Sequence, residues 1–334
     1  MNFTFLLTAA TILVVGWSHF CSAQVTCNGF ISGIINSGVV CGDGDCILDD
    51  ATISGSVKCS FGTLLATGDS FISGSILLSG GITRAELNAV TVLGTVDVFE
   101  AGSLVELVIK QAATLGSVKI ENTAVDVVVA GSLNDLQLID AGSLFANGLS
   151  TVGGVLVSGG NGIIQLCSSF LGSLLVQEHE GDVEINASSG NCTPTTLTGG
   201  MNVNKGSGRV TVIGANLSGG DFIVSEYIGG VILEEAQVSD IKLEKNGGFL
   251  TVLDVLADSD MIITEQEGNV VLENLNSTGD AILEKIKGSL TLHDVINSDM
   301  VITAQEGNVA LSNLNATGDG SGRGSDIGRE QFCR

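Results

Sequence analysis

The sequence predicts an all-β protein, a single-stranded parallel β-solenoid of about 14 coils built from repeats of roughly 20 residues. Residues 259–280 and 298–319 are nearly identical at an offset of 39, and a third copy opens between them at Gly279, so the period is 19 or 20 residues. Apolar residues recur at i and i+2 twice per period, the periodicity of strands rather than helices. The composition, with 46 Gly, 1 Pro and 4% aromatic residues, suits a long stacked chain rich in Val, Ile and Leu, and argues against disorder.

The repeat can be numbered from Met261, which we define as position 0 of its coil. Positions 0, +2, +9, +11 and +14 are then predicted to face inward, and in this coil they hold Met261, Ile263, Val270, Leu272 and Leu275. The residues predicted at position 0 of successive coils are Ile34, Val57, Ile76, Val96, Val118, Leu136, Val155, Leu174, Met201, Phe222, Ile241, Met261, Ala281 and Met300.

Position +7 is glycine in eight consecutive coils. A glycine fixed two residues before the second strand indicates either a turn that needs a positive φ or close stacking of the backbone. These residues are Gly162, Gly181, Gly208, Gly229, Gly248, Gly268, Gly288 and Gly307. The longest step between coils, 27 residues, contains the only proline, Pro194, and we expect a loop insertion there.

A unit of two short strands cannot bury its apolar face alone, so the units must stack. The pattern resembles the parallel β-helix superfamily in general and identifies no single family within it. Leucine-rich repeats share the period, but their L-x-x-L-x-L-x-x-N-x-L spacing differs from two separate strand pairs, which favours the β-helix.

The chain divides into four expected segments. Residues 1–23 are predicted to be a signal peptide, because the apolar run Phe3–Val15 precedes the small-residue cleavage pattern ending at Ala23. An N-terminal membrane anchor is the alternative, although the run is short for a bilayer. Residues 24–54 are expected to form a disulfide-rich cap, 55–319 the solenoid, and 320–334 a Gly-rich tail. The protein is therefore expected to be secreted and extracellular.

Cysteine usage agrees with an oxidising compartment. We expect Cys167 to pair with Cys192, and the remaining bridges to join members of the cluster Cys27, Cys41, Cys46 and Cys59, which leaves Cys333 unpaired within the chain. Five sequons predict glycosylation at Asn186, Asn191, Asn216, Asn276 and Asn315.

The net charge of −24 disfavours nucleic acids and anionic lipids as partners, and favours cations, mineral surfaces or basic partners. One acidic column stands immediately before position 0, and stacked carboxylates about 5 Å apart repel by ~1 kcal/mol even in water. Weakly bound Ca²⁺ would relieve that repulsion and is the only cofactor that the sequence suggests. The alternative is that each aspartate serves as a turn residue. The predicted metal-binding residues are Asp221, Asp240, Asp260, Asp280, Asp299 and Asp319.

Two other polar features have structural interpretations. Position +13 runs Glu235, Asp254, Asn274, Asp294 and Asn313, a column that can hydrogen-bond from coil to coil. The acidic segment 178–184 surrounds His179 and could form a metal site, but its place at a corner favours a solvated loop.

The sequence does not favour an enzyme. β-Helices often host pectin-degrading enzymes, but the families that resemble polygalacturonases carry paired Asp, Ser-His-Gly and Arg-Ile-Lys motifs, and this chain has no Ser-His-Gly. Outward position +1 is often apolar, which favours a packing or partner surface over a sugar cleft. The residues of this stripe are Leu175, Ile223, Ile262, Ile282 and Val301.

Taken as a function, these features predict a secreted, acidic structural protein of an extracellular matrix, coat or mineralised tissue. Its expected partners are matrix, mineral or cell-surface components, together with other copies through the solenoid ends or Cys333. The alternative is an adhesin or carbohydrate-binding β-helix module, and a polysaccharide lyase or hydrolase is third.

Overall fold

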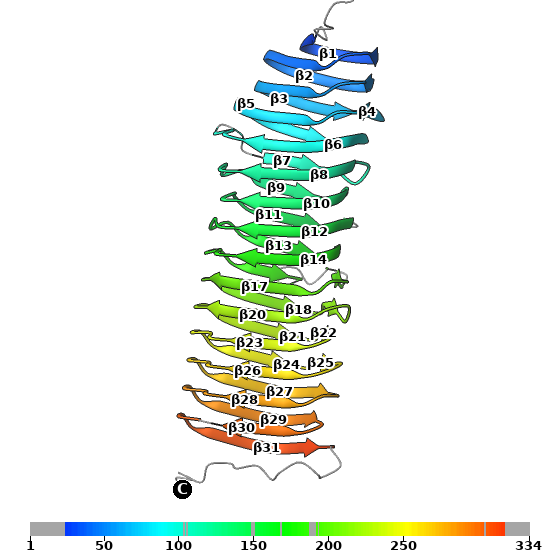
Figure 1. The fold of residues 1–334 in the computed structure, drawn as a ribbon. Helices are drawn as coiled ribbons and strands as arrows, with labels where there is room; N and C mark the ends of the chain where they lie inside the picture. Colours follow the sequence, from blue (N-terminus) through cyan, green and yellow to red (C-terminus); the bar gives the residue numbers. More distant parts are fainter. Residues whose placement is uncertain are drawn as a thin grey trace, which may run out of the picture.

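The computed structural model describes residues 24–102, 104, 106–147, 151–167, 169–186, 192, 194–303 and 305–317. These residues form a parallel β-solenoid of about 14 turns, which confirms the predicted fold class. The turns stack along one axis as a rod, with β1 at one end and β31 at the other (Figure 1). The described residues contain no helix, and so none that could cross a membrane.

Every turn is built from short parallel strands. Up to the insertion they are β1 (Val25–Ile35), β2 (Val39–Ile53), β3 (Val57–Thr67), β4 (Ser70–Ile72), β5 (Ile76–Leu87), β6 (Val90–Phe99), β7 (Glu106–Ile109), β8 (Thr114–Glu121), β9 (Asp126–Val129), β10 (Ser132–Ile139), β11 (Leu144–Asn147), β12 (Thr151–Ser158), β13 (Ile164–Cys167), β14 (Phe170–Gln177) and β15 (Val183–Ile185). Beyond it they are β16 (Thr196–Leu197), β17 (Met201–Gly206), β18 (Arg209–Ile213), β19 (Asn216–Leu217), β20 (Phe222–Tyr227), β21 (Gly230–Glu234), β22 (Gln237–Val238), β23 (Ile241–Glu244), β24 (Leu250–Leu253), β25 (Leu256–Ala257), β26 (Met261–Thr264), β27 (Val270–Ser277), β28 (Ala281–Glu284), β29 (Leu290–Asn297), β30 (Met300–Thr303) and β31 (Val309–Ala316).

Each coil has three sides. The first side carries position 0, the second begins at +9, and a short third side begins near +15, so β20 pairs with β23, β21 with β24 and β22 with β25. The third side was not separated from the second in the sequence frame. It is short and often continues directly from the second side, as in β27.

The predicted register holds from Val57 to Met300, because every predicted position-0 residue in that range is the parallel partner of the next. It holds across the 27-residue step, where Leu174 pairs with Met201. The assignment of Ile34 was wrong. Val39 is the partner of Val57 and Val25 is the partner of Val39, while Ile34 faces outward with 73% of its surface exposed. The first coil contains only 14 residues, so a 20-residue frame misplaces it.

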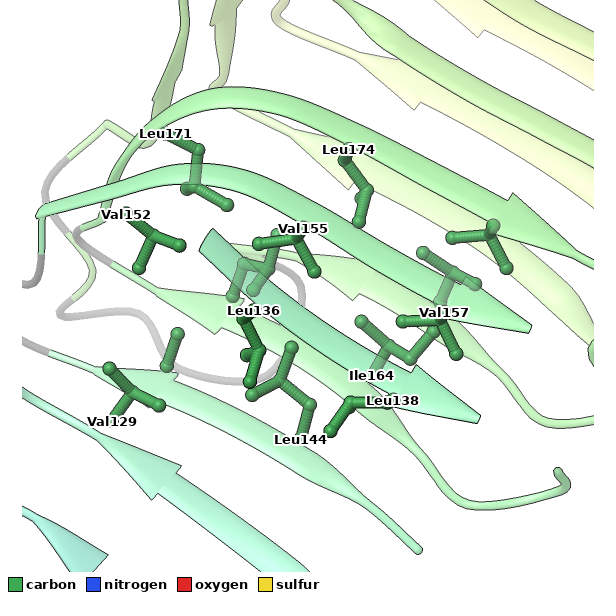
Figure 2. Packing of buried hydrophobic residues seen from close by; sticks show 14 of the residues in the cluster. Val129, Leu136, Leu138, Leu144, Val152, Val155, Val157, Ile164, Leu171 and Leu174 are labelled. Atoms are coloured by element: carbon green, nitrogen blue, oxygen red, sulfur yellow. The ribbon is translucent and has the colours of Figure 1, made fainter. Parts of the chain in front are cut away.

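The core is one continuous column of aliphatic side chains contributed by all three sides. In the middle of the rod, Leu136 and Leu138 of the first side face Leu144 of the second, while Val152 comes from the third (Figure 2). Each inward residue also rests on its equivalent in the next coil, as Leu136 does on Val155. Stacking therefore buries surface that a single coil would leave in water.

The glycine column at +7 is explained by close stacking rather than by φ. Gly248 and Gly268 have no positive φ, but a Cβ at either position would overlap the carbonyl group of the column glycine in the preceding coil. The backbones of successive coils touch at this corner, and any side chain would push them apart. Gly208 is the one member of the column that also has a positive φ, of 95°.

Candidate functional site

The aspartate column before position 0 is the most regular polar feature of the surface. In three of its aspartates, Asp240, Asp260 and Asp280, the carboxylate accepts a hydrogen bond from the backbone N–H of the aspartate in the following coil. The N–H to Oδ1 distances are 3.1 Å from Asp260 to Asp240, 2.9 Å from Asp280 to Asp260 and 3.2 Å from Asp299 to Asp280. We call the column formed by Asp221, Asp240, Asp260, Asp280 and Asp299 the aspartate ladder. These aspartate side chains therefore bond to the backbone of the next coil. The bond fixes one of the two oxygens of each accepting carboxylate.

Lys242 lies at one end of the ladder, and its ammonium group forms ion pairs with two of the aspartates. Its Nζ is 2.7 Å from Oδ2 of Asp221 and 2.9 Å from Oδ2 of Asp240. The hydrogen bond from Lys242 holds the pKa of the Asp240 carboxyl below its ordinary value, and hydrogen bonds from Ser259 and from the Asp260 backbone act in the same direction. The two aspartates in turn raise the pKa of Lys242.

Five of the six predicted metal-binding aspartates therefore lie in one column, and Asp319 lies outside the described residues. Their spacing along the rod gives a line of carboxylates rather than a cage. Within the part of the chain that the structure describes, no three His, Cys, Asp or Glu side chains gather closely enough to hold a metal ion. Binding of Ca²⁺ stays a prediction, and this geometry fits only loosely held ions.

A second charged column, at position +4, alternates in sign from one coil to the next. Lys285 contacts Glu265 at 2.8 Å. Lys245 contacts its sequence neighbour Glu244 at 3.3 Å, and Glu226 and Glu265 in the two adjacent coils add a weaker attraction. Beside it, Lys287 at +6 contacts Glu267 at 2.7 Å. Alternation places unlike charges opposite each other on neighbouring strands, and like charges there would be destabilising. The column runs Glu178, Lys205, Glu226, Lys245, Glu265 and Lys285.

The column at +13 behaves as the sequence predicts. Asn274 donates from Nδ2 to Oδ1 of Asp254 at 2.8 Å, so an amide and a carboxylate bond from coil to coil. Asp254, Asn274, Asp294 and Asn313 all have φ between 51° and 53°. Asp and Asn tolerate this left-handed region better than most residues, which explains their presence at this corner.

The sequence frame missed a buried polar column at position +5, inside the corner between the first and second sides. Its side chains donate to backbone carbonyl groups of the preceding coil: Asn246 to Val224 at 3.2 Å, Gln266 to Gly248, and Gln305 to Gly288 at 2.7 Å. The hydroxyl of Tyr227 donates to Ser207, and burial raises the pKa of that hydroxyl, with Asp182 adding to the effect. The column ties the corner of one coil to backbone carbonyl groups of the preceding coil. Its signal in the sequence is a polar residue two places before the corner glycine, interrupted by Gly206 and Ile286.

His179 belongs to this column, so the expectation that it lies in a solvated loop was wrong. Its ring is 1% exposed, and Nδ1 and Nε2 each lie 2.9 Å from a carbonyl oxygen, of Gly159 and Gly162 respectively. Both ring nitrogens are thus occupied by backbone, which is a structural use of the side chain.

Three cysteine pairs lie at disulfide distance and indicate an oxidising environment. Cys167 pairs with Cys192, as predicted, and ties the inserted loop to the coil before it. The cluster near the N-terminus pairs within itself, Cys27 with Cys46 and Cys41 with Cys59, and links the first three coils. Cys333 lies outside the described residues.

The sequons differ in accessibility. Asn276 and Asn315 are exposed and lie two coils apart on the third side, and Asn216 is half-buried there. Asn186 is engaged at both ends of its amide: Oδ1 accepts from the Thr195 hydroxyl at 2.7 Å and Nδ2 donates to Gly214 at 3.3 Å. Asn191 lies outside the described residues. Glycosylation stays a prediction, and Asn276 and Asn315 suit it best.

The apolar stripe at +1 is interrupted. Its residues do share one outward column of the first side, but Asn202 stands between Leu175 and Ile223, and Lys242 between Ile223 and Ile262. A continuous apolar docking strip along the whole rod is therefore not present on the first side of the described coils.

Comparisons of the chain with protein-family models, with curated proteins and with solved structures gave no match.

Proposed function

We propose that this chain is a secreted structural rod of an extracellular matrix, coat or mineralised tissue. One observation carries the proposal: parallel pairing of successive coils continues from β2 to β31, with only local register shifts between β3 and β5 and between β6 and β8, and it continues across an inserted loop. Such a stack has fixed length and presents fixed columns of side chains, which suits a spacer or scaffold. The disulfides that link its first three coils support an extracellular setting.

The acidic surface favours loosely bound cations or mineral as the environment of this rod. Asp260, Asp280 and Asp299 have no cationic partner among the described side chains, in contrast to the alternating column at +4. Because they form a line and not a cage, each site should be weak, roughly in the millimolar class of extracellular modules, and weakened further by salt.

The test is calorimetric titration of Ca²⁺ into the full chain and into the triple variant Asp260→Asn, Asp280→Asn, Asp299→Asn. An asparagine Oδ1 can accept the same backbone N–H, so the ladder should persist while its charge is removed. We expect the number of bound ions to fall in this variant. In the matched control Glu234→Gln, Glu273→Gln, Glu284→Gln, which removes the same charge from other columns, it should fall less. Equal uptake in both variants would leave the ladder with a purely structural role.

The scaffold proposal has its own test. A glycan array and a screen for polysaccharide lyase and hydrolase activity should both be negative for the full chain. A specific glycan signal would favour the adhesin or carbohydrate-binding alternative, and turnover of a polysaccharide would overturn the proposal.

A further inference from the structure

The C-terminal end of the rod exposes residues whose equivalents in the preceding coil are buried. Val309, Leu311 and Leu314 of β31 are 44%, 38% and 37% exposed. Their partners in β29 are Leu290, Leu292 and Val295, each 0% exposed because β31 covers them. The last described coil thus presents an open apolar face and an unpaired strand edge, a template for another β-segment.

The segment that follows in the sequence does not continue the repeat. If Asp319 keeps its place in the aspartate column, the next inward positions 0, +2, +9 and +11 fall on Gly320, Gly322, Arg329 and Gln331. None of these supplies an aliphatic side chain, so the apolar pattern of the repeat does not continue in this part of the sequence.

The N-terminal end has the complementary properties. Val25 holds position 0 of the first coil and is 36% exposed. Among the described residues its one strand partner is Val39 in the second coil. Ile31 and Ile35 pack against the end of the core and are only partly buried. The disulfide between Cys27 and Cys46 ties this coil to the second one, so its edge is held in strand form.

Both ends carry little charge. In a chain of net charge −24, residues 24–42 contain no Asp, Glu, Lys or Arg, and residues 300–318 contain only Glu306, although the middle of the rod, residues 141–177, is uncharged as well. Electrostatic repulsion between two copies that meet end to end is therefore weak at the contact.

Backbone hydrogen bonds between coils run in both directions. Val25 donates to Gly38 and Leu290 to Asn308 in the following coil, whereas Thr317 donates to Asn297 in the preceding one. The open edges of the last coil and of the first coil of another copy therefore each offer donors and acceptors, and these match when the two coils meet in the parallel arrangement that successive coils use. The corner between the first and second sides is shorter in the first coil than in the coil that follows it. Two copies would therefore contact each other along the strands of the sides and not at this corner.

We propose that copies of this chain stack head to tail, with β30 and β31 of one copy continuing onto β1 of the next. Met300 then covers Val25, and Leu311 covers Ile31, in the register that successive coils use. The contact is heterologous and does not close, so it generates fibres that grow by about 65 Å per copy at ~4.8 Å per coil. This inference concerns assembly and does not require cation binding or a scaffold role.

The experiment follows the length distribution of the full chain, purified with its disulfides intact, by light scattering and electron microscopy over a range of concentrations. We expect wild-type rods in multiples of one length. Leu311→Lys and Val25→Lys should each remain monomeric. The matched controls Ser312→Lys and Thr26→Lys place the same charge on the outward face of the same strands, and should still form fibres. Circular dichroism should show unchanged strand content in all four variants.

Mixing decides the polarity. Leu311→Lys retains its first coil and Val25→Lys retains its last, so an equimolar mixture should form pairs and nothing longer. Dimers of Val25→Lys alone would mean that the C-terminal ends meet each other, which overturns the head-to-tail arrangement. A wild-type chain that stays monomeric at every concentration would overturn the proposal altogether, and would point to residues 318–334 as the cover of the last coil.

Discussion

At the scale of single residues, the corner between the first and second sides of each coil reverses the usual use of glycine. Position +4 has a left-handed backbone, φ 53° at Glu226 and 55° at Lys245, yet it carries charged residues. Position +7 has no such requirement at Gly248 and Gly268, yet it is glycine. A non-glycine residue in the left-handed region costs on the order of 1 kcal/mol. At position +4 the side chains that carry this cost form the column of alternating charge. The glycine serves instead to bring two backbones together.

Adjacent glycines allow this explanation to be tested. Gly248→Ala should destabilise the protein by about 1–3 kcal/mol, because the new Cβ overlaps the backbone of Gly229 in the preceding coil. Gly247→Ala should be neutral or stabilising by a few tenths up to ~1 kcal/mol, since its Cβ would make only ordinary contacts and alanine restricts the unfolded chain. Chemical denaturation of both variants measures the difference. If Gly247→Ala were the more damaging change, stacking would not be the reason for the column.

At the scale of elements, a column of like charges and columns of unlike charges coexist on one surface. The aspartate ladder is stabilised through backbone N–H groups and through Lys242, whereas the +4 column is stabilised by alternation. Exposed ion pairs each contribute little, so the columns act mainly by penalising the wrong partner in the next coil.

Lys242 gives the ladder a measurable pH dependence. Because Lys242 lowers the pKa of Asp240, this carboxylate stabilises the fold at pH values above the ordinary carboxyl range, and the contribution is lost as the pH falls through the lowered pKa. In Lys242→Met we expect the pKa of Asp240 to rise, as followed by its carboxyl ¹³C shift. The control Lys285→Met, which removes a lysine from the +4 column, should leave the pKa of Asp240 unchanged. An Asp240 that titrates identically in wild type and Lys242→Met would show that the backbone bond alone sets its pKa.

At the scale of the whole molecule, the rod is held differently at its two ends. Two disulfides link the first three coils, while the last described coil is held by its hydrogen bonds and its contacts with β28 and β29. In stacked repeats, unfolding starts most readily at ends, because a terminal coil has one neighbour instead of two. The C-terminal coils should therefore be the first to exchange their amide hydrogens.

Removing the first disulfide should equalise the ends. In Cys27→Ser with Cys46→Ser, we expect amides of β1 and β2 to exchange faster, with a loss of about 3 kcal/mol by the loop-entropy estimate for a loop of roughly 20 residues. The paired change Cys167→Ser with Cys192→Ser removes a bridge in mid-rod and should leave exchange in β1 unchanged. Hydrogen exchange with mass spectrometry compares the two. Unaltered protection of β1 in the first variant would mean that stacking alone holds the end.

The sequence was sufficient to predict the period, the position-0 residues from Val57 onward, the inward positions from Met201 onward and the Cys167–Cys192 pair, because a fixed repeat carries its own register. It misplaced the first coil, since the chain shortens there and Ile34 mimics an inward residue. It also missed the partners of the aspartates and the burial of His179. Those depend on which backbone atoms of a neighbouring coil lie within reach, and a one-dimensional pattern does not contain that distance.

The alternation of charge at +4 has a consequence for how such a chain can change in length. Lys245, Glu265 and Lys285 show that the sign returns after two coils, and Asp254, Asn274 and Asp294 at +13 repeat with the same double period. Loss of the single coil 260–279 would set Lys245 directly against Lys285, whereas loss of a neighbouring pair of coils would keep every column in order. Duplication and deletion can therefore lengthen or shorten this rod without a charge conflict only two coils at a time, in steps close to the 39-residue offset between its two most similar segments.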